Sequence, residues 1–225
     1  MKLSIIIPVY NERGNILKVL DRVGREDIGI EKEIIIVDDC STDGTRNLLE
    51  RITKHKIFYH SKNMGKGSAI RTALKHATGD ITLIQDADLE YHPEEYPQLL
   101  KPILSGDAEV VYGSRFLYEH RPRYWLNYQG NRFISFLTTL LFFKKITDIE
   151  TCYKVFKTDV IKNIKLKAKR FDFEPEVTAK ILKRGYDIYE VPISYKCRSY
   201  EEGKKITWKD GLASLWYLIK YRFVD

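Results

Sequence analysis

The chain has 225 residues, of which 44% are hydrophobic and 31% charged, so its composition is that of a folded protein rather than a disordered one. Its length suits one sizeable domain or at most two small ones. The formal net charge of +7 favours an anionic partner but leaves open a nucleotide, a lipid phosphate, a membrane surface or nucleic acid. Three widely spaced cysteines without a C-x-x-C pair argue against a zinc site or disulfide scaffold and fit a reducing compartment.

Neither a signal peptide nor a membrane-spanning segment is expected. The N-terminal apolar run enters a strand directly, and Pro8 and the polar residues after it end the run early. The longest apolar run, residues 133–143, contains hydroxyl side chains and is too short to cross a bilayer.

Strands and helices alternate through the first 115 residues. Buried apolar runs predict strands at 3–9, 33–38, 56–60, 81–85 and 109–113. Helical spacing predicts helices from 16, from 45 to about 54, from the turn at 63–67 to a stop at Gly79, and from about 93. The alternation predicts an α/β fold with a doubly wound, mostly parallel sheet. Pro8 indicates that its strand lies at an edge or is about to finish.

The pattern changes after residue 115. A basic, aromatic stretch at 121–146 surrounds the short apolar run, and an amphipathic helix begins near 208. Between them we expect strands at 153–157 and 188–195 and a helix at 174–184. Because no repeat, low-complexity tract or linker interrupts the chain, we expect one domain.

Three of the predicted strands end in polar residues, namely Tyr10-Asn11-Glu12, Asp38-Asp39 and Asp86-x-Asp88. Ligands of open α/β sheets bind outside the carboxyl ends of the strands, so these groups would converge on one crevice. Two carboxylates spaced two residues apart suit a hard divalent cation such as Mg²⁺ or Mn²⁺. Each motif alone is more often a solvated turn, and the convergence of three favours a site.

The Gly65-Lys66-Gly67 turn precedes a predicted helix and can bring backbone N–H groups and a lysine near a phosphate. Its spacing is not that of a P-loop, and no Gly-x-Gly-x-x-Gly follows the first strand. These absences argue against a P-loop NTPase and against an NAD enzyme.

Four motifs in the first 90 residues resemble those of family 2 glycosyltransferases with the GT-A fold. They are Ile5-Ile6-Ile7-Pro8-Val9-Tyr10-Asn11-Glu12, the segment 36–45, Asn63-x-Gly65-Lys66-Gly67 and Asp86-Ala87-Asp88. The second half is similar to the dolichyl- or polyprenyl-phosphate mannose and glucose synthases of that family, through segments at 113–115, 131–133, 147–154, 171–174 and 198–205. The resemblance implies a single GT-A catalytic domain over 1–225, with a nucleotide-sugar-binding half at 1–115, an acceptor half at 116–207 and a C-terminal amphipathic helix at 208–225.

On the donor side, the resemblance implies a nucleotide site and a metal site. The residues that would bind the nucleotide are Pro8, Tyr10, Glu12, Asp39, Lys66, Arg71, Asp86 and Ala87. Among them, Asp39 would accept hydrogen bonds from the base. The residues that would bind Mg²⁺ or Mn²⁺ are Asp86, Asp88 and Glu90, and Glu90 stands where related synthases often carry Gln.

On the acceptor side, the resemblance implies a cluster of phosphate-binding residues: Arg115, Arg132, Ser135, Arg198, Lys204 and Lys205. The last three would come from a mobile loop. The candidate catalytic residues are Asp86, Asp88, Arg115 and Asp148. Without the resemblance, surface salt bridges would be the preferred explanation for Arg115 and Arg132. Asp148 and Glu174 could instead cap helices.

The implied function is inverting, metal-dependent transfer of a hexose from a GDP-mannose- or UDP-glucose-type donor to polyprenyl or dolichyl phosphate. A metal and cationic side chains would stabilise the departing diphosphate. A sugar hydroxyl acceptor in cell-wall or surface polysaccharide synthesis is the alternative, and it needs a general base, for which Asp148, Glu174 and Glu176 are candidates. The many Arg and Lys residues of the second half favour the phosphate. A nucleic-acid-binding protein is a further alternative, although no nucleic-acid module is present.

We expect a cytoplasmic protein of cell-envelope synthesis. The chain ends at Asp225 without the transmembrane helices of related synthases, so a lipid acceptor would require peripheral contact with the cytoplasmic face of the membrane. The stretch at 121–145 and the final helix have compositions suited to the membrane interface. Alternatively, each buries its apolar face on the domain or in a homodimer.

Overall fold

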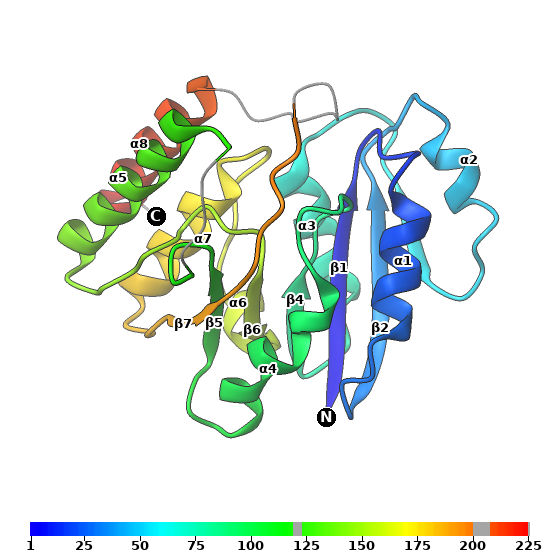
Figure 1. Ribbon diagram of the computed structural model, residues 1–225, viewed down its shortest axis with the longest axis horizontal. Coiled ribbons are helices and arrows are strands. Elements are labelled where there is room, and N and C mark those ends of the chain that lie inside the picture. The colour runs from blue at the N-terminus through cyan, green and yellow to red at the C-terminus, as the bar shows by residue number, and fades with distance from the viewer. Residues whose placement is uncertain (119–122, 200–207, 225) are drawn as a thin grey trace.

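The structure, a computed structural model, describes residues 1–118, 123–199 and 208–224. Within them a seven-stranded mixed sheet has the order β3-β2-β1-β4-β6-β5-β7 (Figure 1). The strands are β1 (Lys2–Val9), β2 (Glu31–Asp38), β3 (Lys56–Tyr59), β4 (Ile81–Ile84), β5 (Val110–Ser114), β6 (Lys154–Lys157) and β7 (Tyr189–Pro192). Strands β3, β2, β1 and β4 are parallel, and β6 runs antiparallel to both β4 and β5. The prediction of a mostly parallel α/β sheet is confirmed.

Strand β1 lies in the middle of the sheet, between β2 and β4, so the edge position that Pro8 suggested is wrong. The alternative that Pro8 indicated, a strand about to finish, is confirmed, because β1 ends one residue later, at Val9. The carbonyl of Ile6 accepts a hydrogen bond from Gln85 just past the end of β4. Pro8 lies two residues further along β1, and its backbone faces the same neighbour as that of Ile6. Because β4 has already ended there, no hydrogen bond to a partner strand is lost through the missing N–H group of proline.

The helices are α1 (Ile16–Arg25), α2 (Thr45–Leu49), α3 (Lys66–His76), α4 (Tyr96–Leu104), α5 (Trp125–Phe142), α6 (Thr158–Lys162), α7 (Phe173–Lys183) and α8 (Trp208–Phe223), with a 3₁₀ turn at Pro93–Glu95. Helix α3 packs on β1 and β2, and α4 packs on β5 and β6. Helix α8 packs against α7 and α5, and Figure 1 shows α5 and α8 at the side of the molecule away from β2.

Two local expectations are wrong, and one helix was not expected. Helix α2 ends at Leu49 rather than near 54, and α6 was not expected. Helix α3 ends at His76, and Gly79 does not stop it by adopting a left-handed conformation. Instead Gly79 lets the chain approach β1, since a Cβ there would lie 2.7 Å from the carbonyl oxygen of Lys2.

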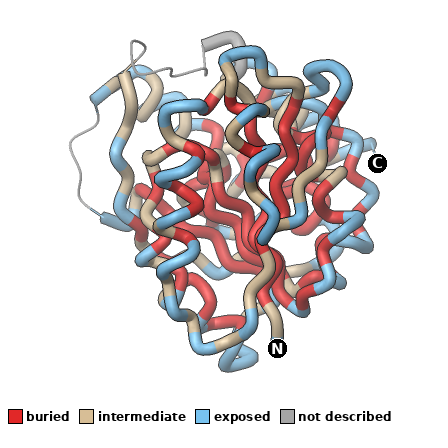
Figure 2. The backbone as a smooth tube through the Cα atoms, turned by 90° about the vertical axis from the view of Figure 1, so that its right-hand side faces the viewer, coloured by how far each residue is buried: buried red, intermediate tan, exposed pale blue. Residues whose placement is uncertain are grey.

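The core runs along the strands, as the red tube in Figure 2 shows. Strands β1 and β4 are buried along almost their whole length, which explains their uninterrupted apolar runs. None of the helices in the described residues combines the length and the apolar character needed to cross a membrane.

Candidate active site

A cavity of about 1,110 Å³ opens at the carboxyl ends of the parallel strands and extends between α5, α7 and α8. We call it the central cavity. The expected site residues that line it are Pro8, Tyr10, Glu12, Asp39, Lys66, Asp86, Ala87, Asp88, Glu90, Arg115 and Arg198. Four expected residues do not line it: Arg71, Arg132, Ser135 and Asp148. Lys204 and Lys205 lie outside the described residues.

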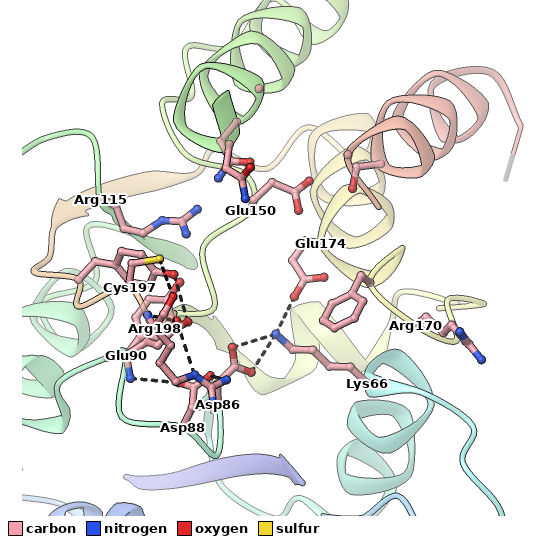
Figure 3. A pocket seen from close by; sticks show the side chains of 18 of the residues that line it. Lys66, Asp86, Asp88, Glu90, Arg115, Glu150, Arg170, Glu174, Cys197 and Arg198 are labelled. Atoms are coloured by element: carbon pink, nitrogen blue, oxygen red, sulfur yellow. Dashed lines mark hydrogen bonds and ion pairs between the residues drawn. The ribbon is translucent and has the colours of Figure 1, made fainter. Parts of the chain in front are cut away.

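Lys66 joins two carboxylates inside the central cavity. Its Nζ lies 2.8 Å from Oδ1 of Asp86, after β4, and 2.9 Å from Oε1 of Glu174, in the first turn of α7 (Figure 3). Burial alone would lower the pKa of Lys66, but the two carboxylates outweigh it and hold this pKa well above its ordinary value. Lys66 is therefore a fixed positive charge between the two halves of the cavity.

Arg198 joins three further carboxylates. Its Nη1 lies 3.2 Å from Oε1 of Glu12, its Nη2 lies 2.8 Å from Oδ2 of Asp88, and its Nε lies 3.6 Å from Oε1 of Glu90. Its backbone N–H also donates to Glu90 over 2.7 Å. Despite this cation, burial and the charges of Asp86 and Glu90 raise the pKa of Asp88 to about 7.

These carboxylates fit one divalent cation shared with phosphates. In the part of the chain that the structure describes, no three His, Cys, Asp or Glu side chains gather as a group that could hold a metal. Glu90 is occupied, because its Oε2 accepts a hydrogen bond from Tyr195 and its Oε1 from Arg198. Asp86 and Asp88 also contact cations, Lys66 and Arg198, and a metal bound here would share these carboxylates with them. Mg²⁺ is commonly held by one or two carboxylates plus substrate phosphates. The raised pKa of Asp88 marks excess negative charge that a cation would neutralise.

The carboxylate of Asp39 is engaged by groups of the protein itself. It is 2% exposed, and its carboxylate accepts hydrogen bonds from the N–H groups of Met64 (2.8 Å) and Gly65 (2.6 Å). Its Oδ1 also lies 2.7 Å from Nδ1 of His60. Asp39 therefore fixes the turn before α3 while still lining the cavity. Sequence reasoning missed His60, although it directly follows β3 as the other polar residues follow their strands.

The N-terminus of α3 is closed by another part of the chain. The N–H groups of Gly67 and Ser68 donate to the carbonyls of Arg170 (3.2 Å) and Lys169 (3.0 Å). Gly65 has φ +90°, and a Cβ on it would lie only 2.4 Å from the carbonyl oxygen of Lys169. The glycines of this turn thus permit close packing of the loop at 168–170. The expectation that these N–H groups face a phosphate is wrong, whereas the Lys66 side chain does point into the cavity (Figure 3).

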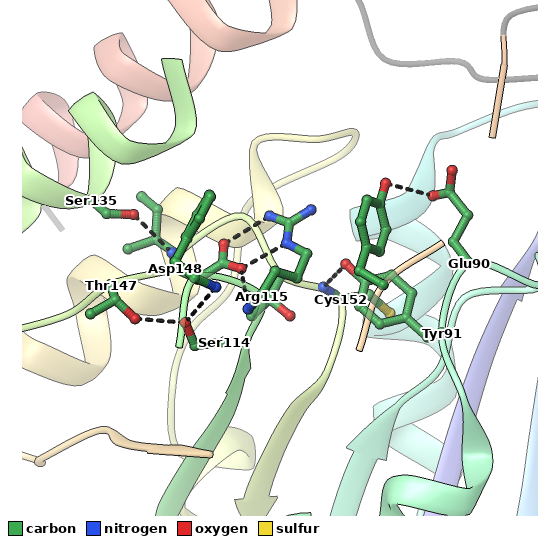
Figure 4. A network of polar contacts seen from close by, with 12 residues as sticks. Glu90, Tyr91, Ser114, Arg115, Ser135, Thr147, Asp148 and Cys152 are labelled. Carbon is green, nitrogen blue, oxygen red and sulfur yellow. Dashed lines mark hydrogen bonds and ion pairs between the residues drawn. The ribbon is translucent and has the colours of Figure 1, made fainter. Parts of the chain in front are cut away.

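The four expected residues outside the cavity lining have other contacts. Asp148 is fully buried and binds Arg115, whereas Ser135 is buried and accepts a hydrogen bond from the N–H of Ile149 (Figure 4). Arg132 is exposed on α5, with its guanidinium 5.8 Å from the ring centre of Tyr128. Arg71 donates to the hydroxyl of Ser68.

The three candidate bases differ in availability. Glu176 is fully buried and accepts hydrogen bonds from the N–H of Ala168 and from Lys180, so it does not face the cavity. Asp148 is occupied by Arg115. Only Glu174 lines the cavity.

Glu150, which sequence reasoning did not single out, also lines the cavity. Burial and the neighbouring Glu174 raise its pKa to about 7. It sits inside the 147–154 segment, but nothing in the sequence distinguishes it from the exposed acidic residues of other loops.

Comparison with known proteins identifies both sequence and structural relatives. Residues 4–165 match the family described as Glycosyl transferase family 2. Dolichol-phosphate mannosyltransferase of Pyrococcus furiosus is 30% identical over 214 residues, covering 91% of this chain and 59% of the relative. Undecaprenyl-phosphate 4-deoxy-4-formamido-L-arabinose transferase of Edwardsiella ictaluri is 28% identical over 208 residues, covering 89% and 62%. The chain thus spans about three fifths of the length of these curated relatives.

Solved structures of glucosyl-3-phosphoglycerate synthase from Mycobacterium tuberculosis share the fold. The complex with Mn²⁺, UDP and glucosyl-3-phosphoglycerate has a TM-score of 0.77 at 18% identity, covering 100% of this chain and 81% of that one. The complex with Mg²⁺ and UDP has a TM-score of 0.74 at 19% identity, covering 100% and 80%. The predicted GT-A fold is confirmed.

Proposed function

The chain belongs to glycosyl transferase family 2, and on that premise we propose that it is an inverting, metal-dependent transferase that moves a hexose from a nucleotide sugar to polyprenyl or dolichyl phosphate. The observation that carries the proposal is one cavity that joins the carboxylates after β4 to the guanidinium of Arg115. A donor and an anionic acceptor can therefore meet in one enclosed space.

On the donor side, the strand-end residues Tyr10, Glu12 and Asp39 form the wall against which the nucleotide would lie. Asp86 and Asp88 would hold Mg²⁺ or Mn²⁺ against the diphosphate. The metal would stabilise the charge that develops as the diphosphate departs. Lys66 supplies a second, fixed positive charge at the same place. Structures of a fold relative contain Mn²⁺ or Mg²⁺ together with UDP, which supports this arrangement.

On the acceptor side, Arg115 is the cation best placed for a phosphate. Asp148 fixes its guanidinium from behind, and the guanidinium also lies 5.0 Å from the ring centre of Tyr195. A phosphate is already ionised and needs no base, which agrees with the engagement of Asp148 and Glu176 in internal pairs. The two curated relatives are named for transfer involving dolichol phosphate and undecaprenyl phosphate.

A sugar hydroxyl acceptor remains the second candidate, and one observation favours it. Glu174 lines the cavity, and its Oε2 has no hydrogen-bond partner among the described residues. Such a carboxylate could accept the proton of a hydroxyl nucleophile.

We further propose that α5 and α8 lie on the membrane surface. Large apolar side chains are exposed along both helices: Trp125, Leu126, Phe133, Phe136, Leu140, Leu212, Trp216, Ile219 and Phe223. Three of them, Leu126, Phe133 and Leu212, also line the central cavity, so the acceptor's chain could remain in the lipid while its phosphate enters. A homodimer through this face is the alternative.

A direct assay tests the function. Purified protein is incubated with radiolabelled GDP-mannose or UDP-glucose, Mn²⁺ and a short polyprenyl phosphate, and lipid-linked label is separated by chromatography. We expect label in the lipid fraction, its loss with EDTA, and its loss in Asp86→Asn. Transfer to free sugars or oligosaccharides without any lipid product would instead establish the hydroxyl acceptor.

A further inference from the structure

Two glutamates in the central cavity each carry an oxygen without a partner. Glu174 is 4% exposed, and its Oε1 binds Lys66 while its Oε2 is buried and unpaired within the described part of the chain. Glu150, from the loop before β6, has a buried Oε1 that likewise lacks a partner there. Figure 3 shows the Glu150 and Glu174 side chains near each other, with Glu174 closer to Lys66. Unpaired buried oxygens are costly, so their presence needs an explanation.

The loop that carries Glu150 is fixed by hydrogen bonds from a buried lysine. Lys154 is fully buried, and its Nζ donates to the carbonyls of Ile149 (2.8 Å) and Thr151, the two residues that flank Glu150. The same ammonium lies 4.4 Å from the ring centre of Tyr112. The hydroxyl of Ser214, on α8, also acts on the Glu150 carboxyl and limits the rise of its pKa. Glu150 is thus positioned by a buried network rather than left on a free loop.

Glu150 and Glu174 each have an oxygen without a hydrogen bond, but positive charge is already present beside them. Lys66 contacts Glu174, and the charge of Lys154 acts on both carboxyl groups. Burial and Glu174 also raise the pKa of Glu150 and so reduce the negative charge that this group carries at neutral pH. A cationic ligand would therefore find little uncompensated negative charge. Neutral hydroxyl groups, which both donate and accept, would satisfy the free oxygens.

The position of the pair relative to Asp86 indicates which hydroxyls these are. A single ammonium group, that of Lys66, separates the Glu174 carboxylate from the Asp86 carboxylate. In the proposed function Asp86 holds the metal and diphosphate, so the sugar bonded to that diphosphate would lie beside Glu174 and Glu150. We propose that these two residues bind hydroxyl groups of the donor's sugar ring and thereby determine which hexose is accepted. The inference rests on the proposed function and specifies its substrate.

Calorimetric titration in the presence of Mn²⁺ tests the inference. UDP, GDP, UDP-glucose, GDP-mannose and deoxy analogues of both sugars are compared on the wild-type protein, Glu150→Met and Glu150→Gln. Methionine keeps the length of the side chain but cannot bond hydroxyls, whereas glutamine can. Thr151→Val is the matched control, because Thr151 is the buried neighbour of Glu150, its hydroxyl is unpaired in the described residues, and it does not line the cavity.

We expect Glu150→Met to bind the diphosphates normally and to bind its preferred sugar nucleotide about tenfold more weakly. One deoxy analogue should bind the wild type more weakly than the parent sugar nucleotide does, and this difference should vanish in Glu150→Met and partly return in Glu150→Gln. The inference is overturned if Glu150→Met keeps the full preference for hydroxylated sugars, or if it weakens diphosphate and sugar nucleotide equally. If the wild type binds no diphosphate with Mn²⁺, the proposed function itself fails.

Discussion

Arg115 and Asp148 form a buried bidentate ion pair (Figure 4). The Arg115 Nε lies 2.7 Å from Oδ2 of Asp148, and the Arg115 Nη2 lies 2.8 Å from Oδ1. The backbone N–H of Arg115 donates to the same carboxylate over 3.1 Å. Both oxygens of Asp148 are therefore engaged, so this residue positions a cation rather than accepting a proton from substrate.

Removal of Asp148 should damage the fold as well as activity. Asp148→Ala leaves the Arg115 guanidinium buried without its partner, which costs roughly 3–5 kcal/mol of unfolding free energy. Urea denaturation followed by circular dichroism measures the change. The double variant Arg115→Met/Asp148→Leu should recover much of the lost stability. A single variant that unfolds at the wild-type urea concentration would show that the pair is not structurally important.

Glu150 should make stability depend on pH. Its pKa is raised to about 7 by burial and by Glu174, so the folded state binds this proton more tightly than the unfolded state does. The resulting stabilisation is full below the ordinary glutamate pKa and is lost as pH rises through 7. Glu150→Gln should therefore gain on the order of 2 kcal/mol relative to wild type between pH 5 and pH 8. Denaturant midpoints at the two pH values test this, and parallel profiles would contradict it.

Arg198 should compete with the metal for carboxylates. In Arg198→Ala the carboxylates of Glu12, Asp88 and Glu90 lose their shared cation, so we expect a melting temperature lower by a few degrees without metal. Mn²⁺ should then raise the melting temperature more in the variant than in the wild type. Arg25→Ala, which removes an exposed pair with Asp21, is the control. Equal responses to Mn²⁺ would mean that Arg198 and the metal do not share ligands.

Two glycines with similar positive φ angles should respond differently to alanine. Gly106 has φ +84° with open space around it, so Gly106→Ala should cost about 1 kcal/mol from backbone strain alone. Gly65 has φ +90°, and its added Cβ would collide with the loop at 168–170. Gly65→Ala should lose at least twice as much stability in urea and weaken nucleotide binding by displacing Lys66. Equal losses would show that the loop yields freely.

The exposed face of α5 should mediate vesicle binding. Phe136 is 63% exposed, and Phe136→Ser should weaken sedimentation with anionic vesicles roughly tenfold, because a large apolar side chain leaves the interface. Leu17→Ser on α1, where the leucine is 48% exposed, is the control and should bind as the wild type does. If both variants bind normally while the protein forms dimers, α5 serves self-association instead.

Continuous apolar runs predicted β1, β2 and β4 to within two residues, because short runs rich in Ile and Val are typical of strands covered on both faces. The direction of β6 was not predictable, since the same short run fits a parallel or an antiparallel neighbour. Likewise, α6 has only five residues, too few to show helical periodicity.

Some site residues were predictable from the local sequence, whereas the placement of others depends on tertiary packing. Glu12, Asp39 and Asp86 lie within three residues of the ends of β1, β2 and β4. The carboxyl ends of parallel strands meet at one edge of a sheet. They therefore line one cavity, as expected. Arg132 and Ser135 lie on a helix whose orientation is set by packing against α7 and α8, and the sequence does not reveal which of its faces meets the cavity.

The hydrogen bonds between the start of α3 and the loop at 168–170 join residues roughly a hundred positions apart in the chain. Closing so long a loop is entropically costly and slow compared with forming local helices. Lys66, which begins α3, acquires its final surroundings only after the polypeptide has been made as far as α7. The cavity wall formed by the first half of the chain would thus remain incomplete on the ribosome until the second half emerges.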